Sequence, residues 1–313
     1  MNSHRIALAG GLGNQLFQIA AGIYITNQKE IELDSSFFNP RLNRKGEPEI
    51  LDLIFDNIYL ELSKPKRSRI SRKLANIVLG HPTKEKNLIR FLNYKTSKKL
   101  LEYLESNING SLTQIITEGY KSKKSENEKY DKAFCQFLQI GYFQSAGYVT
   151  PVRQMLLDFE IKNFDPKLWL SLNKINKEKN LIIHIRRGDY LQEPKFGLVG
   201  ENYYKRAIEL QLNRFEYEAI LIFSDDLVEA KKIIGTNYPI QTFYVDDTNL
   251  SSGAILKLMS LGYGYIIANS SFSWWSAMLS KRGFDRVIAP IPWFKKVSYS
   301  HDILPDNWRK IPW

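Results

Sequence analysis

Two adjacent arginines, Arg186 and Arg187, lie in the segment His184–Tyr190, at the end of an apolar run. An arginine guanidinium is planar and permanently charged, and it can donate hydrogen bonds to two phosphate oxygens at once. Side chains alternate along a strand, so His184 and Arg186 are expected on one face and Arg187 on the other. We therefore predict that Arg186, with His184 beside it, binds an anion such as a diphosphate. Arg187 is expected to form a structural ion pair with Asp189.

Two aspartates, Asp225 and Asp226, follow the apolar run Ala219–Phe223. Carboxylates in this position often cap the N-terminus of the helix that follows, and we expect one of the two to do so. The other is expected to accept hydrogen bonds from a ribose or from the N–H groups of a purine base. The sequence does not decide which aspartate has which role.

Small polar residues open a predicted helix after the apolar residues 265–268. They are Asn269, Ser270 and Ser271, followed by Phe272. The first backbone N–H groups of a helix are unpaired and attract anions, so this segment is predicted to hold a phosphate. The alternative is an ordinary serine N-cap in front of a packed aromatic pair, Trp274 and Trp275.

A glycine-rich turn follows the first apolar run of the chain. Glycines let a ligand approach the backbone closely, so Gly11, Gly13 and the adjacent Asn14 are candidate binding residues. The turn also half-matches the dinucleotide-binding fingerprint, with Asp34 about 20 residues further on. Leu16 stands where that fingerprint needs a third small residue. An NAD(P)-dependent oxidoreductase is therefore one alternative function.

The elements that must position these residues are short strands alternating with helices. In the C-terminal half, strands are predicted at residues 181–185, 219–223, 242–245, 265–268 and 286–289. Strands that alternate with single helices imply right-handed crossovers and a parallel sheet with helices on both faces. The predicted fold class is therefore α/β.

The N-terminal half opens with a predicted strand at residues 4–9, a glycine turn, a helix from Leu16 and a strand at 31–34, which form a βαβ unit. A β-like run at 134–143 leads into a helix that ends near Phe159. With a linker near residue 170, we expect an N-terminal domain over residues 1–165 and a C-terminal domain over residues 175–313.

The net charge of +11, from 44 Lys and Arg and 33 Asp and Glu, is unevenly distributed. Residues 61–132 hold 17 basic and 8 acidic residues, a net +9, and are expected to form a helical insertion with helices near 73–79 and 98–106. Such a surface attracts an anionic membrane or a phosphorylated acceptor, unless it is simply solvated. Because aromatic residues are not interleaved with the bases, no nucleic-acid partner is expected.

Composition and motifs exclude several protein classes. No apolar run approaches the roughly 20 residues of a transmembrane helix, and the polar start of the chain does not match a signal peptide. We expect a cytoplasmic protein with peripheral contact to the inner face of the membrane. Cys135 is the single cysteine, so no internal disulfide is expected. No metal site is expected, because the sequence has no Asp-x-Asp motif and its four histidines are scattered.

Segments spread along the chain, taken together and in this order, resemble those of the α-1,2-fucosyltransferases of glycosyltransferase family 11. The resemblance covers most of the chain but not residues 61–132. Its segments are Gly10–Gln18, Ile140–Ser145, His184–Tyr190, Phe223–Asp226, Asn269–Trp275, Ile288–Pro290 and Trp293–Phe294.

This resemblance implies a GT-B-like fold of two Rossmann-like halves that face a cleft. It also implies GDP-fucose as the donor and an inverting transfer that leaves an α-linked fucose on a sugar 2-hydroxyl. Arg186 and helix-start N–H groups would then take the place of the divalent ion with which many transferases stabilise the leaving diphosphate, so no cofactor is expected.

The resemblance further implies roles for the candidate residues. Arg186 would contact the β-phosphate, and His184 would lie near the nucleoside. One of Asp225 and Asp226 would read guanine. The segment from Asn269 to Phe272 would hold the pyrophosphate, and the one from Gly11 to Asn14 would face the sugar and the diphosphate from the opposite domain.

An inverting transfer usually needs a base that takes the proton of the acceptor hydroxyl as it attacks. Asp189 is the first candidate, against a purely structural role in a turn or an ion pair. Glu193 and Glu201 follow it in the chain and are the next candidates. A loose, oxocarbenium-like transition state would need no strong base.

The acceptor is expected to be a bacterial surface glycan precursor, such as an O-antigen unit or another lipid-linked oligosaccharide. This expectation follows from the basic surface and the expected cytoplasmic location. A membrane- or nucleic-acid-binding module without catalytic activity is the second alternative function.

Overall fold

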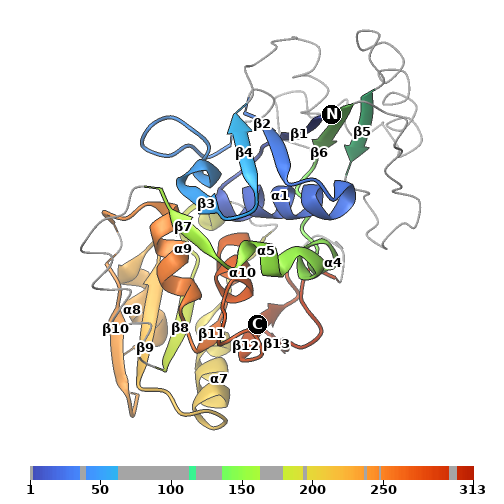
Figure 1. Ribbon diagram of the computed structural model, residues 1–313. Helices are drawn as coiled ribbons and strands as arrows, with labels where there is room; N and C mark the ends of the chain where they lie inside the picture. The colour runs from blue at the N-terminus through green and yellow to red at the C-terminus, as the bar shows by residue number, and fades with distance from the viewer. Residues whose placement is uncertain are drawn as a thin grey trace, which may run out of the picture. The chain divides into compact units, whose positions relative to one another are not determined.

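A computed structural model describes residues 3–35, 40–62, 113–117, 136–162, 179–192, 196–235, 238–246, 248–295 and 302–313 (Figure 1). The chain divides into two compact units. The N-terminal unit is Met1–Asp158 with Ser300–Ile303, and the C-terminal unit is Phe159–Tyr299 with Leu304–Trp313. The predicted linker near residue 170 and the helices predicted at 73–79 and 98–106 lie outside the described residues.

The N-terminal unit is built on a parallel sheet whose five described strands have the order β4-β2-β1-β6-β5. Their bounds are β1 Ser3–Ala7, β2 Glu30–Asp34, β4 Tyr59–Leu62, β5 Thr113–Thr117 and β6 Gln136–Ile140. The helix α1, Leu12–Thr26, connects β1 to β2 (Figure 1), so the predicted βαβ unit is confirmed.

The helix α1 begins earlier than predicted. It starts at Leu12 with Gly11 as its N-cap, so Gly13 lies in its first turn and not in a loop before Leu16. Only Gly10 has a left-handed backbone among these glycines, with φ of 72°. A Cβ atom on Gly10 would lie 2.3 Å from Asn14 Nδ2, so this position requires glycine.

The remaining elements of the N-terminal unit are short. They are the 3-10 helix η1 Glu49–Asp52, the strand β3 Leu53–Phe55, the helix α4 Ala146–Val149, the 3-10 helix η2 Thr150–Val152 and the helix α5 Arg153–Leu156. The helix predicted to end near Phe159 is therefore present as three consecutive short pieces.

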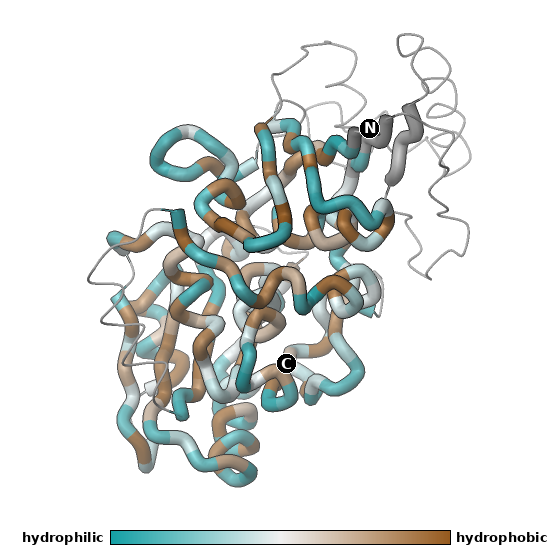
Figure 2. Tube along the Cα trace, in the orientation of Figure 1, coloured by the Kyte–Doolittle hydropathy of each residue, from teal (hydrophilic) through white to brown (hydrophobic). Residues whose placement is uncertain are grey.

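The C-terminal unit contains a parallel sheet whose six described strands have the order β10-β9-β8-β11-β12-β13. Their bounds are β8 Asn180–Ile185, β9 Ala219–Ser224, β10 Gln241–Tyr244, β11 Gly264–Ile266, β12 Val287–Ile291 and β13 Arg309–Pro312. Hydrophobic residues, brown in Figure 2, follow one another along β9 because this strand is buried on both faces. The edge strand β13 was not predicted.

Helices cover both faces of this sheet. The helices α7, Glu201–Leu212, and α8, Leu227–Ile234, pack against Leu181, Ile183 and Ile185 of β8. The helices α9, Ser252–Ser260, and α10, Ser271–Met278, pack against each other (Figure 1). The unit also contains the strand β7 Phe159–Ile161 and the 3-10 helix η3 Gly188–Gln192. The predicted α/β class is confirmed, and each of the two units is built on a parallel sheet.

Candidate functional site

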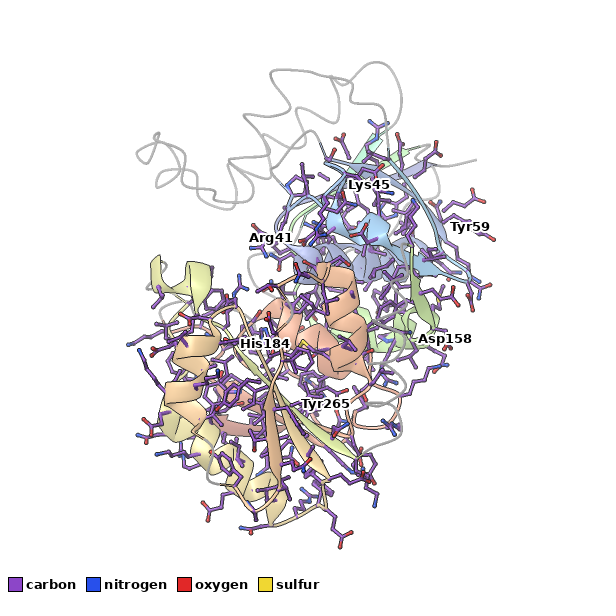
Figure 3. The ribbon with its side chains drawn as sticks, turned by 90° about the vertical axis from the view of Figure 1, so that its left-hand side faces the viewer. Arg41, Lys45, Tyr59, Asp158, His184 and Tyr265 are labelled. Atoms are coloured by element: carbon purple, nitrogen blue, oxygen red, sulfur yellow. The ribbon has the colours of Figure 1, made fainter. Side chains whose placement is uncertain are left out.

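Three of the predicted binding segments follow neighbouring strands of the C-terminal sheet. The strand β8 lies between β9 and β11, with Ile185 beside Ser224 and Ile183 beside Ile266. Because these strands are parallel, the segments after them emerge at the same edge, where ligands of open α/β sheets bind. His184, labelled in Figure 3, lies at the end of β8.

Arg186 forms an ion pair with Asp225 at this edge. Arg186 Nη1 lies 3.0 Å from Asp225 Oδ2, and the two side chains are 16% and 25% exposed. The backbone N–H of Arg187 donates to the other oxygen, Asp225 Oδ1, at 2.8 Å. The carboxylate therefore holds both the guanidinium of Arg186 and the turn that follows β8.

The side chain of Arg187 contacts the core around α7 and α8. It is buried, and its Nη2 donates to the carbonyl oxygen of Val199, which belongs to the core around α7 and α8. The side chain of its predicted partner, Asp189, lies outside the described residues. Arg187 thus makes a structural contact with the backbone carbonyl of Val199, in addition to any contact with Asp189.

Asp226 is the N-cap of α8. Its Oδ1 accepts a hydrogen bond of 2.9 Å from the backbone N–H of Glu229. Capping by one of the two adjacent aspartates is confirmed, and the structure identifies the capping residue as Asp226. Each aspartate thus has protein partners, one at a helix start and the other at Arg186.

His184 is buried on the face of the sheet opposite α7. Its ring centroid lies 5.9 Å from that of Phe272 at the start of α10. Burial, and then the positive charge of Arg186, lower the pKa of His184 to about 3. The imidazole is therefore neutral near pH 7 and too weakly basic to act as a proton acceptor.

The start of α10 presents backbone N–H groups. Ser270 is the N-cap, but its side chain makes no capping hydrogen bond. The first-turn N–H groups of a helix have no intrahelical acceptor and attract negative charge. The predicted aromatic pair is also present, because Trp274 and Trp275 are fully buried with ring centroids 5.1 Å apart. These two side chains fix the helix whose first turn faces the strand ends.

Asn269 links the start of α10 to two other segments. Its Nδ2 donates to the carbonyl oxygens of Phe196, at 3.0 Å, and Gly197, at 3.3 Å. Its own carbonyl accepts a 3.0 Å hydrogen bond from the hydroxyl of Tyr190. The guanidinium carbon of Arg186 lies 5.7 Å from the centroid of the Tyr190 ring, within the range of a cation–π contact. Sequence reasoning missed Tyr190, although it belongs to the same segment as Arg186.

The predicted binding residues of the N-terminal unit, Gly11, Gly13 and Asn14, form the N-cap and the first turn of α1. The backbone N–H of Leu12, which follows the N-cap Gly11, donates to Glu49 Oε2 at 2.8 Å. Asn14 Oδ1 accepts a 2.7 Å hydrogen bond from Gln144 Nε2. Glu49 was missed by sequence reasoning because it is 37 residues from its partner. A diphosphate at this helix start would have to displace a buried carboxylate, which disfavours a dinucleotide site here.

Of the three candidate bases, only Glu201 has its side chain among the described residues. The backbone of Asp189 lies in η3, but its side chain and the whole of Glu193 are outside the described residues. Glu201 forms an ion pair with Lys205 on the surface of α7. The base therefore stays a prediction.

The described residues contain no group of three or more His, Cys, Asp or Glu side chains placed to hold a metal ion. Within the same ranges, the structure has no helix whose length and apolar character would allow it to cross a membrane.

The sequence matches a family model described as "Glycosyl transferase family 11" over residues 82–311. This match includes the segments around Arg186 and Asn269 but not the one from Gly10 to Gln18. An α-1,2-colitosyltransferase of Escherichia coli is 30% identical over 321 residues, which cover 97% of each chain. The O-antigen biosynthesis glycosyltransferase WbnK of Escherichia coli is 28% identical over 327 residues, covering 96% of this chain and 98% of that protein.

Two solved structures are similar to this chain at low sequence identity. The fucosyltransferase NodZ from Bradyrhizobium is 10% identical, with a TM-score of 0.46 over 90% of this chain and 94% of that one. POFUT1 in complex with GDP-fucose is also 10% identical, with a TM-score of 0.47 over 92% of this chain and 97% of that one.

Proposed function

Because this chain belongs to glycosyl transferase family 11, we propose that it transfers L-fucose from GDP-fucose to the 2-hydroxyl of an acceptor sugar with inversion at the anomeric carbon. The family makes the protein a glycosyltransferase. The observation that carries the donor assignment is the position of Arg186 at the carboxyl end of β8, next to Asp225 and Tyr190. A fixed guanidinium at this edge suits a diphosphate.

In this proposal the donor site lies at the strand ends of the C-terminal unit. Arg186 contacts the β-phosphate, and the segment Asn269, Ser270, Ser271 and Phe272 binds the pyrophosphate through the N–H groups of the first turn of α10. His184, neutral and packed on Phe272, lies near the nucleoside. Gly11, Gly13 and Asn14 of the N-terminal unit approach the transferred sugar.

The chemistry that these groups supply is stabilisation of the leaving group. When the bond between the anomeric carbon and oxygen breaks, negative charge grows on GDP, and fixed donors aimed at that charge lower the barrier. We propose that Arg186 and the N–H groups of α10 are sufficient, so that no metal ion is required. Asp189 is the proposed base for the acceptor hydroxyl.

The names of the two Escherichia coli relatives suggest the acceptor and the linkage. One relative is named as an α-1,2-transferase and the other for O-antigen biosynthesis. We propose an α-1,2 linkage to a bacterial surface glycan precursor, either an O-antigen unit or a lipid-linked oligosaccharide. The basic residues 61–132 are proposed to bring the enzyme to an anionic membrane surface. Neither an oxidoreductase nor a binding module without activity is favoured by these relatives.

The donor and linkage can be tested by turnover. Purified protein is incubated with GDP-fucose, or with the GDP ester of colitose, and an array of oligosaccharides in the presence of a chelator. The proposal predicts transfer of fucose, with methylation analysis of the product showing substitution at a 2-hydroxyl. Transfer of colitose but not fucose would contradict the proposed donor sugar. A product substituted at another hydroxyl would contradict the proposed α-1,2 linkage. Activity that is lost in chelator and restored by a divalent ion would contradict metal independence.

A further inference from the structure

Building on the proposed function, we propose that Asp225 is a positioning residue of the donor site. It orients Arg186 toward the diphosphate and does not read the guanine base. Both roles were open for this carboxylate on the sequence alone, because an aspartate after a strand accepts hydrogen bonds equally well from a base or from an arginine. The contacts of the two carboxylate oxygens of Asp225 distinguish between these two roles.

Both carboxylate oxygens of Asp225 are engaged by the turn after β8. Asp225 Oδ2 lies 3.0 Å from Arg186 Nη1, and Asp225 Oδ1 accepts from the backbone N–H of Arg187 at 2.8 Å. Reading guanine edge-on would require the carboxylate to present oxygens to two N–H groups of the base. In this geometry one acceptor site of each oxygen is already directed at the protein, and reading the base would compete with the contact to the charged guanidinium, which is the stronger type of hydrogen bond.

The surrounding backbone leaves the Asp225 carboxylate little room to turn. A Cβ atom on Gly188 would lie 2.5 Å from Asp225 Oδ2 and 3.3 Å from its Cγ. The backbone of Gly188 is not left-handed, so its conformation does not require glycine. The close approach of the Asp225 carboxylate is the reason that a side chain does not fit at this position. The pair is also only 16% and 25% exposed, so water and salt screen it less than a surface ion pair.

Tyr190 limits Arg186 from another direction. Its ring centroid is 5.7 Å from the guanidinium carbon, and its hydroxyl is tied to the carbonyl of Asn269, the residue before the N-cap of α10. The guanidinium is thereby tied through Tyr190 to the start of the helix that is proposed to bind the pyrophosphate. A guanidinium has five N–H donors, so pairing with Asp225 through Nη1 is compatible with a contact to phosphate.

The test compares three nucleotides on the wild type and on Asp225→Asn by calorimetric titration. The ratio of GDP to GMP affinity reports the contact to the β-phosphate, and the ratio of GDP to IDP affinity reports the contact to the 2-amino group of guanine. Asp225→Asn is expected to weaken GDP binding about tenfold, to change GMP binding little, and to leave the ratio of GDP to IDP affinity unchanged. Glu32→Gln is the matched control, because Glu32 forms a half-buried ion pair with Arg5 in the N-terminal unit.

A double-mutant cycle with Arg186→Gln shows whether Asp225 acts through Arg186. The double variant is expected to bind GDP no more weakly than Arg186→Gln alone, whereas independent contacts would lower the affinity further. Folding is followed by thermal unfolding, and Asp225→Glu, which keeps the charge, replaces Asp225→Asn if that variant does not fold.

Three results would overturn the inference. A lost preference for GDP over IDP in Asp225→Asn would make Asp225 the base reader, and unchanged affinities for all three nucleotides would remove it from the donor site. A wild type that binds no GDP would overturn the proposed function and the inference together, so the two failures are distinguishable.

Discussion

The hydroxyl of Tyr190 donates a 3.0 Å hydrogen bond to the backbone carbonyl of Asn269, and this contact joins the turn after β8 to the start of α10. The two residues are 79 positions apart in the chain. The ring of Tyr190 also lies beside Arg186, so one side chain connects two groups that are proposed to bind the same diphosphate.

Replacing Tyr190 by phenylalanine should therefore lower donor affinity while keeping the fold. The ring stays beside Arg186, but the tie to α10 is lost. A hydrogen bond of this kind contributes about 1 kcal/mol, which corresponds to a rise in the KM for the donor of about fivefold. Tyr238→Phe is the control, because the Tyr238 hydroxyl donates at the same distance to the carbonyl of Ile234, the last residue of α8, and so makes a local contact. Equal KM values for the two variants would contradict the role of this contact.

Gly188→Ala should impair donor binding by displacing the carboxylate of Asp225. The new Cβ atom would lie 2.5 Å from Asp225 Oδ2, a distance shorter than Cβ atoms show in real structures, so the carboxylate would have to move. We expect at least about a tenfold loss of GDP affinity, the equivalent of roughly 1.4 kcal/mol. Gly200→Ala is the matched control, because a Cβ atom on Gly200 meets nothing within 4 Å. The steric account fails if both variants bind GDP like the wild type.

Glu49→Gln should destabilise the N-terminal unit. The Glu49 carboxylate accepts from the N–H of Leu12 and places a negative charge at the start of α1, where the helix dipole favours it. The amide of the introduced glutamine can still accept this hydrogen bond but carries no charge. We therefore expect the free energy of unfolding to fall by about 0.5 to 1 kcal/mol. Urea unfolding measures this loss, with Glu47→Gln, two residues earlier in the chain, as the control. A loss no larger than that of the control would contradict the capping role.

Stability should fall as the pH decreases from about 6.5 toward 4, because buried histidines resist protonation. Burial lowers the pKa of His4 to about 4, whereas an unfolded histidine titrates near 6.5. The unfolded state then binds more protons across this window, so folding loses about 2 kcal/mol between pH 7 and 5 from this residue. His184 acts with the same sign, since burial and Arg186 lower its pKa to about 3.

His4→Gln tests the contribution of His4 because glutamine does not titrate. Urea unfolding at pH 7 and pH 5 should show a smaller loss of stability for this variant than for the wild type, with the remaining loss due partly to His184. An identical loss in both proteins would contradict this account, because it would show that the pKa of His4 is the same in the folded and unfolded states.

The fold was predictable where the determinants are local. Strands such as β8 and β9 are short, mostly apolar runs, and this pattern in the sequence predicts a buried strand. The edge strand β13, Arg309–Pro312, was missed because its residues are mostly polar and exposed and its pairing with β12 is its main determinant. The start of α1 was placed too late because the carboxylate that accepts from its first N–H group, that of Glu49, comes from a distant segment.

The candidate site divides in the same way. The position of Arg186 at a strand end and the capping role of one aspartate follow from strand and helix geometry, so sequence reasoning found both. The pairing of Asp225 with Arg186 and the contact of Tyr190 with Asn269 depend on β8 lying between β9 and β11. Strand order is not encoded in any local pattern, so these contacts could only be observed in the structure.

The central claim is that Arg186 binds the diphosphate of the donor, and calorimetric titration of GDP tests it most directly. The wild type should bind GDP but not NAD, and Arg186→Gln should weaken GDP binding roughly a hundredfold, as expected for the loss of about 2.7 kcal/mol from a charge-assisted contact. Arg214→Gln, at the opposite edge of the same sheet, should bind like the wild type. An Arg186→Gln variant that binds GDP as tightly as the wild type would contradict the account.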